Sequence, residues 1–155
     1  MSMSAGESRL RDSLDSLLRV RAARGKDGRP RDHRRALGRY GEKLAVEHLL
    51  ARGFSLLARN YRTRRGEIDL IAFDGRTLIF VEVKTHQLGR SQPPASVSPL
   101  AYLSAGQLAR YRPVAQAYLD DPRHTSPAAQ EMRFDAIGVL VDAEGAVMDL
   151  MHVEG

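Results

Sequence analysis

Three residues whose types and spacing suit phosphodiester chemistry lie in the middle of the chain. Asp69 is followed by Glu82 and, two positions later, by Lys84. Two carboxylates that converge bind hard divalent cations such as Mg2+ or Mn2+. Such an ion holds phosphate oxygens and lowers the pKa of a bound water, while a neighbouring lysine orients that water or stabilises charge on phosphorus. The pattern therefore indicates a metal-dependent site for phosphodiester hydrolysis.

The segment that carries these residues predicts a β-hairpin. Residues 67–73 and 77–85 are rich in β-branched and aromatic side chains, as strands require. The dipeptide Asp74–Gly75 between them is a strong signal for a two-residue hairpin loop. We therefore expect Phe73 to pair with Arg76 across this loop.

That pairing places the acids and the lysine on one face of the hairpin. Glu67 then faces Glu82, Asp69 faces Phe80, and Lys84 lies on the same side because side chains alternate along a strand. Asp69 and Glu82 become diagonal neighbours, with Cα atoms about 7–8 Å apart. The opposite face is expected to be wholly apolar, with Ile68, Leu70, Ala72, Ile79, Val81 and Val83. The alternative interpretation, an ion pair of Lys84 with either acid, accounts less well for all three together.

The remaining pattern predicts a mixed sheet flanked by helices. Apolar residues at helical spacing indicate a first helix from about residue 36 to residue 51, ended by Gly53, before a strand over residues 54–61. A helix over residues 100–119 and strands over residues 132–141 and 146–153 follow the hairpin. Pro113 implies a kink in that helix or a later start. The order α-β-β-β-α-β-β is typical of an α/β domain, in which the strand of residues 77–85 is central and covered on both faces.

Composition limits the classes of protein to be considered. The chain has 155 residues, no cysteine and a net charge of +5. Residues 1–36 hold ten basic and five acidic side chains and the remainder holds fourteen of each, so the excess charge lies in the N-terminal segment. We expect residues 1–35 to form a basic, flexible extension and residues 36–155 to form one domain. Without a long apolar run, the chain is expected to be cytoplasmic and not bound to a membrane.

Five sequence blocks resemble the YraN-like family of small bacterial proteins. The blocks are Gly41-Glu42, Arg59-Asn60-Tyr61-Arg62, Gly66-Glu67-Ile68-Asp69-Leu70-Ile71, Phe80-Val81-Glu82-Val83-Lys84 and Arg133-Phe134-Asp135. This family is similar to the PD-(D/E)XK, or restriction-endonuclease-like, nuclease superfamily, near the archaeal Holliday-junction resolvases. The resemblance covers about residues 36–153 and implies an αβββαβ core.

The resemblance also implies roles for particular residues. Asp69 and Glu82 would be the metal ligands and Lys84 the catalytic lysine. Glu42 matches a glutamate that resolvase-like members place near the metal, although an ordinary charge at the start of a helix explains it equally well. Glu67 and Gln107 are candidates for supporting the site, Gln107 through a Gln-x-x-x-Tyr pattern that ends at Tyr111.

Four arginines precede the strand that bears Asp69. Arg59, Arg62, Arg64 and Arg65 are candidates for contacting nucleic-acid phosphates, and a solvated turn with local ion pairs is the alternative. Arg133 and Asp135 are expected to form a structural ion pair, and the five dispersed histidines are expected at the surface.

The sequence thus favours a nucleic-acid phosphodiesterase of endonuclease type that uses Mg2+ or Mn2+. Its substrate would be DNA in preference to RNA, with branched or structured DNA suggested by the resolvases. By the same analogy the protein would form a homodimer. The alternative is a module on a nuclease-like fold that binds nucleic acid or a recombination partner without cutting.

Overall fold

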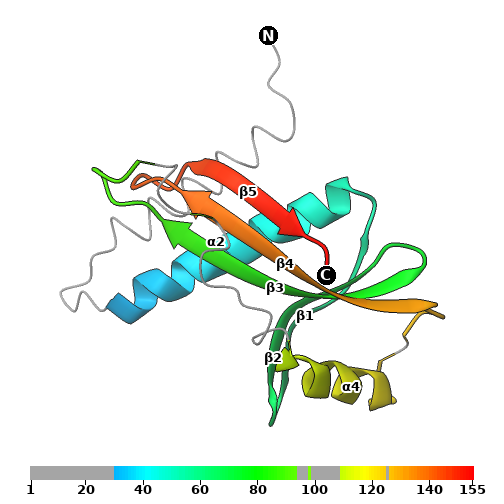
Figure 1. The fold of residues 1–155 in the computed structure, drawn as a ribbon. Helices are drawn as coiled ribbons and strands as arrows, with labels where there is room; N and C mark the ends of the chain where they lie inside the picture. Colours follow the sequence, from blue (N-terminus) through cyan, green and yellow to red (C-terminus); the bar gives the residue numbers. More distant parts are fainter. Residues whose placement is uncertain (1–29, 94–97, 99–108, 125) are drawn as a thin grey trace.

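A computed structural model describes residues 30–93, 98, 109–124 and 126–155 (Figure 1). Five strands form one sheet in the order β1-β2-β3-β4-β5. They are β1 (Ser55–Thr63), β2 (Gly66–Phe73), β3 (Thr77–Gln87), β4 (Glu131–Val141) and β5 (Val147–Val153). Strands β3 and β4 are parallel and the other neighbours are antiparallel. This mixed sheet, with a helix on each face, is an α/β fold consistent with the restriction-endonuclease-like core.

Helix α2 (Pro30–Ala51) covers one face of the sheet. Its Tyr40, Leu44, Ala45 and Leu49 pack against a cluster that includes Leu70, Ile79, Val81, Val83, Ile137, Val139 and Val141. The helix ends as expected at Gly53, whose φ of +85° suits a residue without a side chain. It begins at Pro30, ahead of the boundary at residue 36 that the sequence suggests.

Helix α4 (Arg112–Asp120) covers the other face. Its Val114, Ala115 and Tyr118 pack against Ile68, Ile71, Leu78 and Phe80. The first seven residues of β3 are consequently buried, as expected for a central strand between two helices. One residue departs from expectation: Ile68 packs on the α4 side and not with Leu70, because the end of the β1–β2 hairpin bends away from the sheet (Figure 1).

The predicted register of the β2–β3 hairpin is wrong by two residues. Phe73 pairs with Leu78, and Leu70 pairs with Val81. The Asp74 side chain accepts the N–H groups of Arg76 and Thr77 at 2.9 and 2.7 Å, which moves the loop to residues 75 and 76. Because side chains alternate with a period of two, this even shift leaves Asp69, Glu82 and Lys84 on the expected face.

The predicted helix over residues 100–119 is not continuous, and its part before residue 109 lies outside the described residues. A turn at Arg110 and Tyr111 precedes α4, and Pro113 occupies its first turn, where a missing N–H costs nothing. Ala109 is helical and the turn separates it from α4, so the chain breaks its helical course just ahead of Pro113. Gln107 lies outside the described residues.

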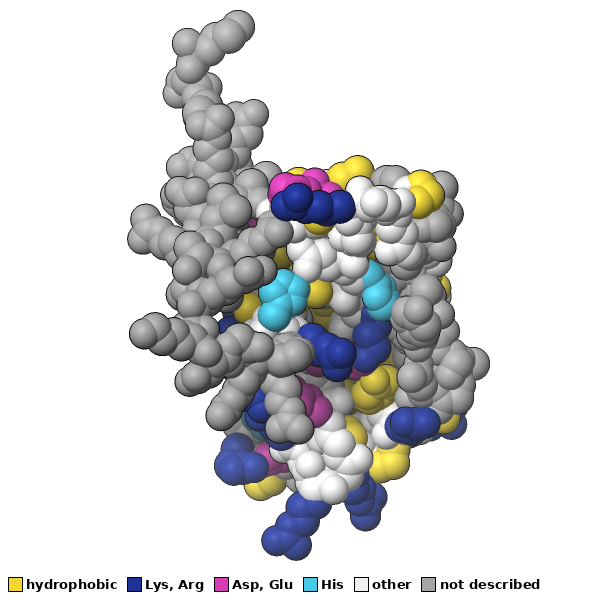
Figure 2. Space-filling model, turned by 90° about the vertical axis from the view of Figure 1, so that its left-hand side faces the viewer, with side chains coloured by type: hydrophobic (Ala, Val, Ile, Leu, Met, Phe, Trp, Pro, Cys, Tyr) yellow, Lys and Arg dark blue, Asp and Glu magenta, His cyan; other side chains and the backbone are white. Residues whose placement is uncertain are grey.

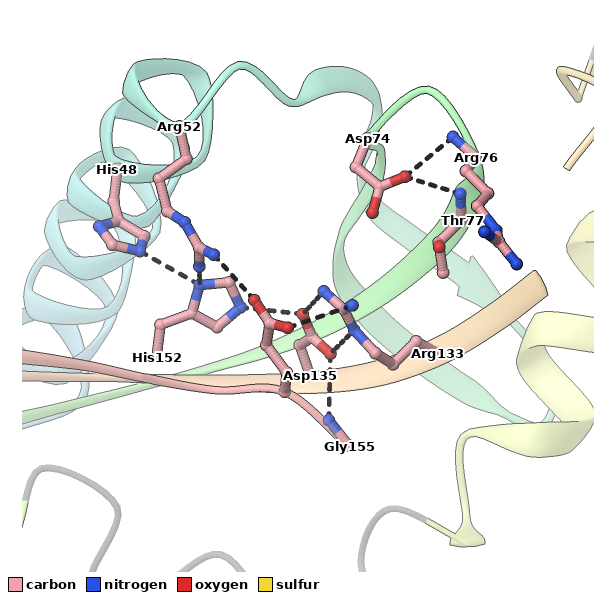
Figure 3. Close-up of polar contacts among 10 residues, drawn as sticks. His48, Arg52, Asp74, Arg76, Thr77, Arg133, Asp135, His152 and Gly155 are labelled. Atoms are coloured by element: carbon pink, nitrogen blue, oxygen red, sulfur yellow. Dashed lines mark hydrogen bonds and ion pairs between the residues drawn. The ribbon is translucent and has the colours of Figure 1, made fainter. Parts of the chain in front are cut away.

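A buried polar network joins the C-terminal strand to α2 (Figure 3). Asp135, fully buried on β4, accepts hydrogen bonds from Arg133 at 2.7 and 3.0 Å, which confirms the expected structural ion pair. His152 contacts Asp135 at 2.9 Å through one ring nitrogen and Arg52 and His48 through the other. The side chain of His152 is only 4% exposed, so the expectation of a surface histidine is wrong here. The hydrogen bond with Asp135 fixes the position of the His152 ring. The sequence around residue 152 does not reveal this long-range contact.

Candidate active site

Asp69 and Glu82 lie where β2 separates from β3. They are the first residues beyond the last pair of the ladder, Leu70 and Val81. Past this point the backbone of β2 no longer reaches β3, and the side chain of Asp69 accepts the N–H of Val83 at 2.8 Å instead. The point where β2 separates from β3 thus brings the carboxylates of Asp69 and Glu82 together. The predicted register placed these two residues diagonally across the strands.

The two carboxyl groups share a largely buried environment. Glu82 is 8% exposed and is hydrogen-bonded to Asp69. Burial, followed by the charge of Glu82, raises the pKa of Asp69 to about 7, although the hydrogen bond from Val83 acts in the opposite direction. Two carboxylates this close do not readily ionise together. Near neutral pH the pair therefore holds a proton that a bound cation would displace.

Lys84 lies beside the pair on the same strand. Its ammonium group forms an ion pair with Glu82, and its side chain is 38% exposed. This is the ion pair that the sequence left open as an alternative to function. It neutralises one carboxylate only, and the groups that most affect Asp69 are acids and a backbone N–H. The ion pair alone consequently does not account for the second, half-buried acid, Asp69.

Glu42 approaches the site from α2. Its charge contributes to the raised pKa of Asp69, and its carboxylate accepts a hydrogen bond from Asn60 at 3.0 Å. The preceding residue makes this approach possible: a Cβ on Gly41 would lie 1.7 Å from the hydroxyl oxygen of Thr85. The helix can therefore pass close to β3 beside Lys84 only because residue 41 has no side chain.

Tyr111 is a site residue that the sequence did not single out. It lies just before α4, and its hydroxyl donates a hydrogen bond to Glu82. Burial and this hydrogen bond raise the pKa of Tyr111, so the phenol stays protonated and remains a donor. The Gln-x-x-x-Tyr pattern contained the signal, but only Gln107 was assigned from it. Asn60, with its positive φ of +49°, is likewise recognised only through its contact with Glu42.

Glu67 does not contact the carboxylate pair and lies in the β1–β2 hairpin. It forms an ion pair with Arg62 at 2.9 and 3.2 Å, the local interaction foreseen as the alternative role for this arginine. Arg59, Arg64 and Arg65 are exposed along the same hairpin. Figure 2 shows basic side chains projecting from the lower end of the molecule, where Figure 1 places this hairpin.

The donor set suits a magnesium ion that retains waters. Within the described ranges, no group of three or more His, Cys, Asp and Glu side chains is placed to hold a metal ion. Mg2+ is commonly held by one or two carboxylates, with water and substrate phosphate at the remaining positions. Asp69 and Glu82 would supply those carboxylates. The pair therefore fits Mg2+ or Mn2+ and does not fit a cation that needs a complete cage of protein ligands.

The chain matches the family described as "Uncharacterised protein family UPF0102" over residues 41–139. A UPF0102 protein of Chlorobium limicola is 45% identical over 109 residues, which span 70% of this chain and 78% of the relative. One from Streptomyces griseus is 44% identical over 73% of this chain and 89% of its own. A UPF0102 protein from Desulfitobacterium hafniense is 37% identical over 80% of this chain and 98% of the relative. The chain belongs to the UPF0102 family, which confirms the YraN-like resemblance.

No helix in the described part of the chain is long and apolar enough to cross a membrane.

Proposed function

We propose that this UPF0102 protein is a metal-dependent nucleic-acid phosphodiesterase of endonuclease type. The observation that carries the proposal is the close pairing of the half-buried Asp69 with the buried Glu82, where burial and the charge of Glu82 raise the pKa of Asp69 to about 7. Maintaining two adjacent buried acids costs stability unless a cation compensates them. Lys84 forms its ion pair with Glu82, and a divalent ion between the carboxylates would compensate Asp69 as well.

Each residue of the site then has a defined task. Asp69 and Glu82 would hold Mg2+ or Mn2+, and such an ion would make water a better nucleophile and neutralise phosphate charge. Lys84 is partly exposed, and its ammonium group beside Glu82 would contact a phosphate oxygen of the substrate. Tyr111 and the N–H of Val83 orient the two carboxylates. Glu42, held by Asn60, adds a further acidic acceptor beside the pair.

The β1–β2 hairpin supplies the proposed nucleic-acid contacts. Its second strand, β2, bears Asp69. The exposed arginines of the hairpin offer bidentate donors for phosphates. We take DNA as the substrate class, and branched DNA within it, from the likeness to junction resolvases. Arg62 already has Glu67 as a partner, so Arg59, Arg64 and Arg65 are the stronger candidates.

Cleavage of a small substrate panel tests the proposal. Linear duplex, single strand, flap and four-way junction are incubated with Mg2+, Mn2+ or EDTA. We expect metal-dependent cutting by the wild type and a loss of at least about 100-fold in Lys84→Ala, because a positioned charge at the transition state has about that effect. Lys43→Ala is the matched control, since Lys43 is an exposed lysine of α2 at 4.0 Å from Glu47.

A binding module without catalysis is the second candidate. The direct Glu82–Lys84 ion pair favours it, because a lysine held by a carboxylate is compatible with a purely structural role. If no substrate is cut while DNA is bound equally well in EDTA and Mg2+, the binding module replaces the enzyme. Equal cutting by wild type and Lys84→Ala would instead remove the assigned role of the lysine.

A further inference from the structure

Strand β5 forms one edge of the sheet and, apart from a bulge near Met148, has few of the features that usually protect such edges. Among the described residues, β5 pairs only with β4, so its outer backbone groups have no strand beside them. Exposed edges are normally protected by lysine, proline or inward-pointing charge. The sequence of β5, VMDLMHV, contains neither lysine nor proline, and Asp149 is its one acid. At the opposite edge, β1 carries Arg59 and Arg62.

The same strand presents apolar side chains to solvent. Met151 pairs with Gly138 and Val153 with Ala136, so both lie on the face of the sheet that α4 covers farther along. They are 39% and 47% exposed, beside small residues of β4 that leave them standing above the surface. The next residues along β5, Leu150 and His152, point to the α2 side, where His152 is held by Asp135.

We infer that β5 pairs in antiparallel fashion with β5 of a second copy of this chain, about a two-fold axis at Met151. A strand that pairs with itself must be self-complementary, and this one is. The arrangement places Met151 opposite Met151 of the second copy, and Asp149 opposite Val153 of the second copy. The two Asp149 carboxylates therefore do not face each other. The bulge near Met148, where the pairing with β4 shifts, confines regular pairing to residues 149–153.

The size of the surface sets the expected strength of association. Stable interfaces bury about 800 Å² on each partner, and five paired residues with two apolar side chains form only the centre of such an area. The dimer is therefore expected to be weak and to depend on protein concentration. A two-fold axis normal to the sheet would place Asp69 of both copies on the same side. Five strand spacings of about 4.8 Å separate the two β3 strands, or about 24 Å.

A cysteine crosslink tests the pairing directly, because the chain contains no cysteine. In Met151→Cys the two thiols would meet at the axis, within the Cα separation of about 4.4–6.8 Å that a disulfide needs. In the matched control Asp149→Cys, on the same strand and face, the thiols would lie four residues apart, about 13 Å. We expect mild oxidation to link Met151→Cys into a dimer and to leave Asp149→Cys monomeric.

Sedimentation of the wild type and of Met151→Glu completes the test. The wild type should show a concentration-dependent dimer, and Met151→Glu should be monomeric at the same concentrations with an unchanged circular dichroism spectrum, because two carboxylates would then meet at the axis. A wild type that remains monomeric at about 100 μM, equal crosslinking of both cysteine variants, or a dimeric Met151→Glu would each overturn the inference. None of these results depends on cleavage, so the proposed function is tested separately.

Discussion

Replacing Asp69 with asparagine should make the protein's stability less dependent on pH. The pKa of Asp69 is raised from an ordinary carboxyl value of 3.8 to about 7, chiefly by burial and then by the charge of Glu82. The folded state therefore keeps a proton that the unfolded state has already lost. Asparagine has the same shape, cannot ionise, and still offers an oxygen to the N–H of Val83.

The size of this effect follows from the difference in pKa. Each pKa unit corresponds to about 1.4 kcal/mol, so a rise of about three units means about 4 kcal/mol. A raised carboxyl pKa lowers the free energy of unfolding as pH rises from about 4 to about 7, and the effect is constant above that range. Between pH 4 and pH 8, the free energy of unfolding of Asp69→Asn should therefore rise by about 4 kcal/mol relative to the wild type.

Urea unfolding at a series of pH values, in EDTA, measures this difference. Glu67→Gln is the matched control, because it removes an acid from the same strand that pairs with Arg62 at the surface. The free energy of unfolding of Glu67→Gln should change with pH nearly as that of the wild type does, and the free energy of unfolding of Asp69→Asn should not. Parallel profiles for Asp69→Asn and the wild type would refute the reasoning, since they would mean that the buried pair does not hold a proton near neutral pH.

Three further predictions concern the scaffold and the hairpin. Gly41→Ala should lose about 1–3 kcal/mol in urea unfolding, because its Cβ would lie 1.7 Å from Thr85, whereas Gly38→Ala, with nothing within 4 Å, should gain up to about 1 kcal/mol. Burial raises the pKa of Asp135, but hydrogen bonds more than offset this and leave it lowered. Its stabilisation is therefore present at neutral pH and lost as pH falls below about 4, so Asp135→Asn should lose about 3–5 kcal/mol at pH 7 and less in acid titrations. Arg65→Ala should weaken DNA binding. The slope of log K against the logarithm of salt concentration should become less steep by about one, as measured by fluorescence anisotropy.

The local features of the fold could be predicted from the sequence because they depend on neighbouring residues. Alternation of apolar residues, the turn near Gly75 and the stop at Gly53 determine where strands and helices begin and end. The faces of Asp69 and Glu82 were also predicted correctly, although the register was not. The register depends on the side chain of Asp74, which binds two backbone N–H groups and moves the loop by one residue.

The interactions that complete the site are long-range, and the sequence order does not reveal them. Tyr111 reaches Glu82 because the chain turns immediately before α4. Asn60 meets Glu42 only after β1 has folded against α2. The separation of β2 from β3 at Asp69 likewise accompanies the bend of the hairpin over α4, where a Cβ at Gly66 would lie 3.3 Å from Val114. Such contacts depend on tertiary packing rather than on local periodicity.

Titration of the wild type and Asp69→Asn with Mn2+ at pH 7.5, followed by calorimetry, tests the central claim most directly. The claim is that Asp69 and Glu82 together bind a divalent ion. It predicts a single site in the wild type, with partial release of the shared proton, and no measurable binding in the variant. The same Mn2+ affinity in Asp69→Asn, or no binding by the wild type with and without DNA, would contradict the claim.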